Sequence, residues 1–149
     1  MIIFYQMSRF LHNLGLKRVS SFLDKIHLVL FGFFIPGSSV IGKNTKFGYG
    51  GLGVVVHKDA KIGNNCLIGQ NVTIGKNIAK KGVPHIGNCV YIGAGSVVFG
   101  NIIIGDNVII GANSVVNRDC KSDSVYAGNP AEFIRPVKKE ELVDIFRKL

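Results

Sequence analysis

The chain has 149 residues, 47% of them hydrophobic, and a formal net charge of +9 from eighteen Lys and Arg against nine Asp and Glu. This length corresponds to one domain, and the apolar content excludes large-scale disorder. The positive charge favours anionic ligands or surfaces, but no nucleic-acid-binding motif accompanies it, so we expect no nucleic-acid partner.

Residues 1–33 are predicted to form an N-terminal helical segment of two short helices, because apolar residues are mixed with basic ones and Gly15 interrupts the run. Ser20 or Ser21 is the predicted cap of the second helix. Two roles remain open for this basic amphipathic segment: it lies on a membrane surface, or it packs on the open first coil of the repeat region that follows. We favour packing on the coil.

The apolar run from Leu28 to Ile35 is too short to span a bilayer. No small-residue cleavage site follows the apolar start of the chain, as a secretory signal would require. We therefore expect a cytoplasmic protein, with peripheral contact to the inner face of the membrane as the alternative for residues 1–33.

Residues 34–135 are dominated by a six-residue repeat in which an aliphatic residue is followed by Gly and, three places later, by a small residue. The aliphatic positions are Ile62, Ile68, Ile74, Ile86, Ile92, Val98, Ile104, Ile110 and Val116. A twelve-residue step between Ile74 and Ile86 interrupts the repeat, which then resumes in phase. A period of six does not fit an amphipathic helix but fits short strands joined at corners. The pattern predicts an all-β solenoid whose aliphatic side chains stack in ladders.

The two flanks of the repeat are less regular. Six glycines between Gly37 and Gly53 predict an irregular turn where the solenoid begins. In the tail, residues 136–149, the apolar Leu142, Ile145, Phe146 and Leu149 fall at helical intervals, which predicts a C-terminal helix or arm.

The three cysteines are expected to be small packed side chains. Cys66 and Cys120 occupy the small position of their hexads, and Cys89 falls at a corner. No cysteine or histidine spacing resembles a metal motif, so we predict no metal site.

Four stretches carry a resemblance to a known family: VVVHKDAKIGNNCLIGQNVTIG, HIGNCVYIGAGSVV, IIIGDNVIIGANSVV and AGNPAEFI. They are similar to the hexapeptide-repeat acyltransferases, within these to the serine acetyltransferase branch, and resemble most the acetyltransferases of polysaccharide gene clusters. The resemblance implies a left-handed parallel β-helix, a homotrimer, acetyl-CoA as co-substrate and transfer of its acetyl group to a hydroxyl. We expect that hydroxyl to belong to a sugar used in surface-polysaccharide biosynthesis.

His57 stands at the hexad position where Gly follows seven of the nine aliphatic residues listed above, and three hexads separate it from Gly75, so we expect it directly beneath that residue. The irregular segment after Gly75 ends at His85. An imidazole suits removal of the proton from an acceptor hydroxyl, which makes His57 the predicted general base and His85 a second catalytic candidate. Backbone N–H groups at Gly75 are the predicted donors to the tetrahedral oxyanion.

The resemblance also implies where acetyl-CoA binds. In the family the cofactor lies between neighbouring subunits along backbone groups at the turns, and the matching positions here are Gly75, Ala94 and Ala112. A family lysine three places before Ala112 is Ile109 in this chain, so another cation must contact the phosphates. The candidates are Lys76, Lys80 and Lys81 in the irregular segment, and also Arg118 and Arg135.

Two histidines of the family are absent from their places. The principal base belongs to an Asp-His pair before a Gly-Thr-Gly turn, where this chain reads GYGGLG and has Tyr49 or Gly50 at the histidine position. The second lies where Val83 stands. These departures argue against L-serine as acceptor, so serine O-acetylation is the alternative activity.

Two other classes of function remain for comparison. One is a noncatalytic scaffold whose basic surface binds a membrane or a partner. The other is a metal-dependent β-helix enzyme of the carbonic anhydrase type, which is disfavoured because it needs three histidines and only His57 and His85 fall within the solenoid.

Overall fold

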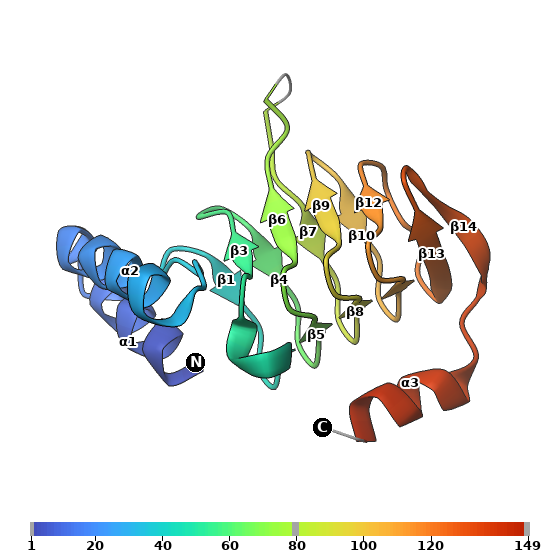
Figure 1. Ribbon diagram of the computed structural model, residues 1–149, viewed down its shortest axis with the longest axis horizontal. Coiled ribbons are helices and arrows are strands. Elements are labelled where there is room, and N and C mark those ends of the chain that lie inside the picture. Colours follow the sequence, from blue (N-terminus) through green and yellow to red (C-terminus); the bar gives the residue numbers. More distant parts are fainter. Residues whose placement is uncertain (1, 79–80, 148–149) are drawn as a thin grey trace.

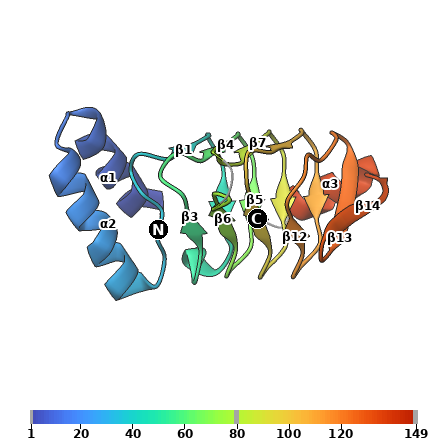
Figure 2. The same ribbon diagram turned by 90° about the horizontal axis from the view of Figure 1, so that it is seen from above.

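A computed structural model describes residues 2–78 and 81–147 (Figure 1). Two helices, α1 (Ile2–Asn13) and α2 (Lys17–Phe31), lie side by side at one end of a row of short strands. A third helix, α3 (Lys139–Arg147), follows the last strands and turns back beneath the row. Seen from above, the strands are stacked one behind another along the long axis of the molecule (Figure 2).

The strands form three faces, and each coil of the chain adds one strand to every face. The first face holds β1 (Val40–Ile41), β4 (Lys61–Ile62), β7 (His85–Ile86) and β10 (Ile103–Ile104). The second face holds β2 (Lys46–Phe47), β5 (Leu67–Ile68), β8 (Tyr91–Ile92), β11 (Ile109–Ile110) and β13 (Ser124–Gly128), with β14 (Ala131–Pro136) antiparallel to β13. The third face holds β3 (Val55–Val56), β6 (Thr73–Gly75), β9 (Val97–Phe99) and β12 (Val115–Val116). The predicted parallel β-solenoid is confirmed.

The aliphatic residues of the repeat line the interior in register, as predicted. Ile62, Ile86 and Ile104 align on the first face, Ile68, Ile92 and Ile110 on the second, and Ile74, Val98 and Val116 on the third. None of the nine is more than 5% exposed. Burying each Val or Ile contributes roughly 1.5 to 3 kcal/mol, and a single hexad cannot do this without coils above and below it.

The corner between the first and second faces is built from stacked residues in the left-handed conformation. Asn44, Asn65, Cys89, Asn107 and Asp123 all have φ between 53° and 58°. Asn and Asp tolerate this conformation better than other residues with a Cβ. Their side chains also join successive coils, since Asn44 Nδ2 donates to Asn65 Oδ1 at 3.2 Å and Asn107 Nδ2 to Asp123 Oδ1 at 2.8 Å. Cys89 interrupts this side-chain ladder.

Restoring the ladder should stabilise the protein. We expect Cys89→Asn to add about 1 kcal/mol, because an amide tolerates the positive φ and gains partners on Asn65 and Asn107. For a chain of this length that corresponds to a rise in Tm of about 2 to 4 °C, measured by calorimetry. A Tm equal to or below that of the parent would contradict the ladder interpretation, and Cys89→Ala controls for loss of the thiol alone.

The twelve-residue step forms a loop that projects from the solenoid between β6 and β7 (Figure 1). It replaces the short corner made one coil earlier by residues 57–60, and the register resumes as predicted, with Ile62 opposite Ile86. Val83 is buried at the base of the loop, whereas Ile78 is fully exposed. Gly82 lies against the next corner, where an added Cβ would come within 2.5 Å of the Asn101 side chain.

The helix pair packs on the first coil through a buried polar network. Ser8 Oγ lies 2.8 Å from Ser20 Oγ and donates to Asp24 Oδ1 at 2.5 Å. The backbone N–H of Gly37 donates to the other oxygen of Asp24 at 3.4 Å. Gly37 approaches α1 so closely that a Cβ there would lie 2.5 Å from the carbonyl carbon of Ser8. The favoured interpretation, packing on the open coil, is confirmed.

The predicted serine cap of α2 is wrong. The helix begins at Lys17 after Leu16, with no capping hydrogen bond from a side chain, because the chain reverses at Gly15 with a φ of 83°. Ser20 therefore falls in the second turn, where its hydroxyl serves the contact with α1.

The C-terminal helix is fixed to β14 by one ion pair. Arg135 Nη1 and Nη2 donate to the two carboxylate oxygens of Glu141 at 2.8 and 2.5 Å. These hydrogen bonds lower the pKa of Glu141 to about 2. Both side chains are partly exposed, so the pair orients α3 more than it stabilises the fold. At its far end α3 brings Phe146 to the corner residues Asn44 and Asn65.

The three thiols should differ in reactivity. Cys66 and Cys120 are buried as predicted, at 1% and 3% exposed, whereas Cys89 is only half-buried. Burial raises the pKa of the Cys66 thiol, and that of Cys120 to about 12, so neither forms the reactive thiolate near neutral pH. We expect titration of the native protein at pH 8 to show one reactive thiol, Cys89, and the denatured protein to show three. Three equally fast thiols in the native state would contradict this packing.

Candidate functional site

His57 lies directly beneath Gly75, as the repeat predicts. Val56 pairs with Ile74 across the third face, and the backbone N–H of His57 donates to the carbonyl of Ile74 at 2.8 Å. His57 is the first residue of the corner that the projecting loop replaces one coil later. His57 and the start of the projecting loop, both of which depart from the repeat, therefore lie at the same edge of the solenoid.

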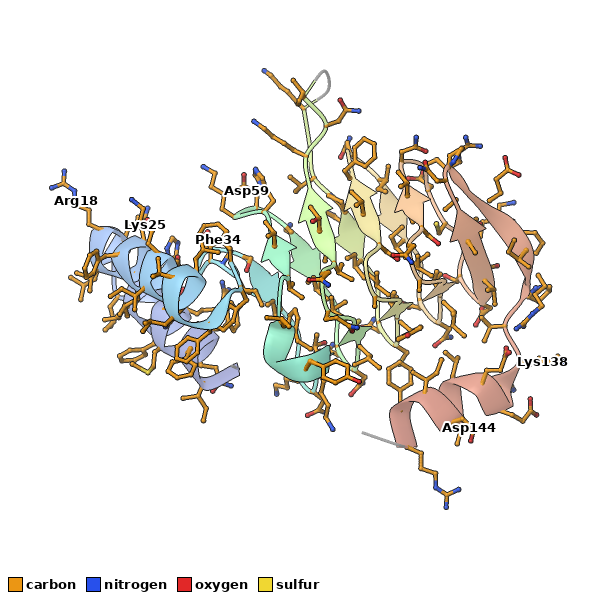
Figure 3. The ribbon with its side chains drawn as sticks, in the orientation of Figure 1. Arg18, Lys25, Phe34, Asp59, Lys138 and Asp144 are labelled. Atoms are coloured by element: carbon orange, nitrogen blue, oxygen red, sulfur yellow. The ribbon has the colours of Figure 1, made fainter. Side chains whose placement is uncertain are left out.

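A groove of about 780 Å³ separates the helix pair from this edge. One wall comes from the helices and the start of the solenoid: His12, Lys17, Ser20, Ser21, Asp24, Phe34, Pro36 and Ser38. The other comes from the third face and its corner: Val55, Val56, His57, Lys58, Asp59, Thr73, Ile74 and Gly75. Figure 3 shows Phe34 between the helices and the strands, and Asp59 on the side of the solenoid from which the loop projects. The His57 side chain is 23% exposed at this groove.

Asp59 is the partner of His57 that the sequence pattern did not reveal. The backbone N–H of Asp59 donates to His57 Nδ1 at 3.2 Å, and Asp59 Oδ2 lies 3.7 Å from the same nitrogen. The spacing His-Lys-Asp across a tight corner is the signal that could have identified it. A neutral ring that accepts at Nδ1 carries its proton on Nε2. In the other neutral tautomer the proton is on Nδ1 and points to the Asp59 carboxylate. Nε2 then has a free lone pair and can accept a proton.

His85 does not join this groove. It lies in β7 on the first face, between Lys61 and Ile103 in register, and its side chain is exposed. There it borders a separate hollow of about 280 Å³ with Asp106 and Ser122. The physical reason is the path of the loop, which leaves the third face and re-enters the first, so that its two ends lie on either side of the edge.

The three positions matched to CoA binding lie at two different edges of the solenoid. Ala94 and Ala112 lie above one another at the corner between the second and third faces, where a Cβ on Gly93 would come within 2.5 Å of the Ala112 nitrogen. Gly75 lies at the opposite end of the third face. It is also part of β6 and opposite Phe99, and its carbonyl accepts from Gly100 at 3.1 Å. Gly75 is thus the last residue of a paired strand and not a free corner, and its role as an oxyanion donor stays a prediction.

The candidate cations are distributed unevenly. Lys76 is exposed at the start of the loop and Lys81 is exposed further along it, whereas Lys80 lies outside the described residues. Arg118 is exposed at a corner. Arg135 is engaged by Glu141, so it is the weakest candidate for a phosphate contact.

The two positions at which the family has catalytic histidines hold other types of residue in this chain. Tyr49 and Gly50 belong to the short 3-10 turn η1 (Gly48–Gly51), both with positive φ, and Tyr49 is 84% exposed. This turn and His57 stand at opposite ends of β3. Val83, at the second place, is buried and apolar. His57 therefore does not occupy the position of the family base.

The comparisons with known proteins agree with this architecture. The family model described as "Bacterial transferase hexapeptide (six repeats)" matches residues 38–76 and 84–118. Serine acetyltransferase 2 of Arabidopsis thaliana is 34% identical over 139 residues, which cover 92% of this chain and 43% of that protein. The serine acetyltransferase of Synechococcus elongatus is 36% identical over 135 residues, covering 89% and 55%. The chain spans about half the length of the curated relatives it matches.

Solved structures extend the similarity to three dimensions. The serine acetyltransferase of Neisseria gonorrhoeae superposes with a TM-score of 0.87 and 32% identity, covering 97% of this chain and 57% of that one. A serine acetyltransferase in complex with CoA gives a TM-score of 0.82 and 32% identity, covering 89% and 55%. The predicted left-handed parallel β-helix is confirmed, and the resemblance to the polysaccharide-cluster branch finds no support in these relatives. The chain belongs to the bacterial transferase hexapeptide family, as a homologue of the serine acetyltransferases.

Proposed function

We propose that the protein is an acetyl-CoA-dependent O-acetyltransferase with His57 as general base. The observation that carries this proposal is the half-buried imidazole at the groove, placed under the loop and beside a carboxylate. The likeness to a serine acetyltransferase solved with CoA supports acetyl-CoA as the co-substrate.

The residues of the groove account for each proton in the reaction. His57 removes the proton of the acceptor hydroxyl as its oxygen attacks the thioester carbonyl, and Asp59 stabilises the imidazolium that forms. When the tetrahedral intermediate collapses, the carbon–sulfur bond breaks and the imidazolium returns the proton to the departing CoA thiolate. The products are the acetyl ester and CoA, and the histidine ends as it began.

Asp59 acts through His57, so its removal should have a smaller and diagnostic effect. We expect Asp59→Asn to lower kcat by roughly tenfold with little change in KM, and to displace the pH profile of kcat. Asp59→Glu should recover part of the loss. An unchanged pH profile in Asp59→Asn would assign Asp59 a structural role only.

The acceptor that the comparisons favour is L-serine, because the relatives are serine acetyltransferases. A sugar hydroxyl remains the second candidate on one specific observation. The position of the Asp-His pair is occupied by the exposed turn η1, so the histidine that the family uses as its principal base is missing here.

A homotrimer would reconcile the two separated sets of CoA positions. Rotation about an axis parallel to the solenoid brings one corner of a subunit against the other corner of its neighbour. The edge with His57, Gly75 and the loop would then face the neighbour's edge with Ala94 and Ala112, and the active site would be shared by two chains.

The decisive experiment measures acetyl transfer by the purified chain. The readout is the decrease in thioester absorbance, because a thiol reagent for the released CoA would also react with Cys89. Acetyl-CoA consumption that depends on L-serine, and is absent with a panel of nucleotide sugars, supports the first acceptor; the reverse supports the second. CoA at a hundred times its Kd should stabilise the protein by about 2.7 kcal/mol. No thermal shift with CoA and no acceptor-dependent consumption would leave the noncatalytic scaffold.

A further inference from the structure

We propose that the outer face of the N-terminal helix pair binds the surface of an anionic membrane. This outer helical face consists of exposed apolar residues of α1, α2 and the turn between them: Ile3, Met7, Phe10, Leu14, Val19, Phe22, Val29 and Leu30. Each is between 47% and 82% exposed. The proposal concerns a surface apart from the groove and does not depend on the acetyl transfer.

The helix pair is apolar on two sides, and the solenoid uses only one of them. On α1, the residues Ile3, Met7 and Phe10 follow helical spacing along one side, while Tyr5 and Ser8 are buried on the other. On α2, Phe22 and Val29 repeat the pattern opposite the buried Asp24 and His27. So many exposed large apolar side chains on one helix pair are uncommon on a protein without a partner for them.

The charge on this face has one sign. Arg18 and Lys25 fall on the same stripe of α2 as Phe22 and Val29, spaced by four, three and four residues. Figure 3 shows the Arg18 side chain projecting away from the solenoid and Lys25 projecting from the side of α2. Within residues 2–58, all described by the structure, the sole carboxylate is Asp24, which is 5% exposed and bonded to Ser8 and Gly37. Exposed cations on this face therefore have no acidic neighbour on it.

This excess of positive charge favours an anionic membrane over a second copy of the chain as the partner of the outer helical face. A second copy meeting the same face would set Arg18 and Lys25 against cations of its own kind, which disfavours the contact. An anionic bilayer surface offers both phosphate groups for the cations and an apolar layer for the phenylalanines. A hollow of about 340 Å³ on α2, lined by Phe22, Ile26, Val29 and Leu30 with Lys25 beside them, suits an acyl chain below a phosphate. In the described part of the chain no helix is long and apolar enough to cross a bilayer, so the contact would lie in the plane of the interface.

The test is sedimentation of the full chain with vesicles of phosphatidylcholine alone and of phosphatidylcholine with about one third phosphatidylglycerol. We expect binding to the anionic vesicles to be at least tenfold tighter and to weaken at 0.5 M NaCl. The double variant Arg18→Glu with Lys25→Glu should lose binding, and Phe22→Ser with Val29→Ser should weaken it at least tenfold. A matched control is Ile103→Ser, which removes an equally exposed apolar side chain from the first face.

Each variant is used only if it keeps the cooperative melting transition of the parent, since α2 also contacts the solenoid. Equal binding to both vesicle types, or binding that survives the charge reversal, would overturn the proposal. So would a parent protein that ignores vesicles but forms a larger assembly that Phe22→Ser with Val29→Ser reduces, because a second copy would then be the occupant. Acetyl transfer in solution should be retained by both double variants, which separates this result from the proposed function.

Discussion

His57→Ala should lower the turnover of acetyl transfer by about 10²- to 10⁴-fold, the contribution expected of a positioned general base. The backbone of residue 57 already donates to the carbonyl of Ile74, and that bond survives the change. The side chain is partly exposed at the groove, and the hydrogen bond that its ring accepts from the Asp59 N–H is exposed to solvent, so the variant should melt within a few degrees of the parent. The measurement is kcat under saturating acetyl-CoA together with the thermal transition.

Two neighbours provide the controls for this result. Lys58→Ala changes the next residue of the same corner and should keep kcat within about threefold. His85→Ala tests the second predicted catalytic residue, which the structure places on another face. A His57→Ala enzyme within tenfold of the parent would remove His57 from the mechanism. A loss in His85→Ala equal to that of His57→Ala would mean that a neighbouring subunit brings His85 to the site.

Ile92→Asp should abolish the folded state at room temperature. Ile92 is fully buried and stands between Ile68 and Ile110 in the ladder of the second face. A carboxylate there has no hydrogen-bonding partner, and the cost of burying it is comparable to the whole stability of about 5 to 15 kcal/mol of an ordinary domain. Circular dichroism and calorimetry should show loss of strand signal and of the cooperative transition.

The matched control places the same change on the outside of the solenoid. Ile103 is a β10 residue that is 62% exposed, so Ile103→Asp should cost less than about 1 kcal/mol. Ile92→Val, which removes one methylene, should cost about 0.5 to 1.5 kcal/mol. Undiminished strand content and melting temperature in Ile92→Asp would contradict the stacked ladder.

The period of the repeat was sufficient to predict the solenoid and the position of His57 in the candidate site. It placed Ile62, Ile86 and the other aliphatic residues inside, and it placed His57 beneath Gly75, because a fixed period fixes which residues lie one coil apart. It also located the interruption. These features follow from the number of residues in each coil, because the parallel strands pair in a constant register from one coil to the next.

Features that depend on the path of the chain between counted positions were not predictable in the same way. The loop after Gly75 carries His85 around the edge to another face, and no period describes its course. Gly75 was expected at a free corner, but β6 is one residue longer than most strands and includes it. The serine cap failed because the chain reverses at Gly15 and α2 begins at Lys17, so that Ser20 lies inside the helix and its hydroxyl contacts Ser8 of α1. Asp59 was missed because its relation to His57 is a matter of local corner geometry.

Whole-coil construction has an evolutionary consequence for this protein. Tyr91 pairs with Ile109, so the eighteen residues from Tyr91 to Val108 make one complete turn. Duplicating or deleting such a unit on the C-terminal side lengthens or shortens the rod and leaves the separation between the helix pair and the His57 corner untouched. The same operation on the N-terminal side would displace that corner from the helices that wall its groove. A coil added on the C-terminal side therefore leaves the groove intact and changes only where α3 folds back, whereas a coil added on the N-terminal side takes the groove apart.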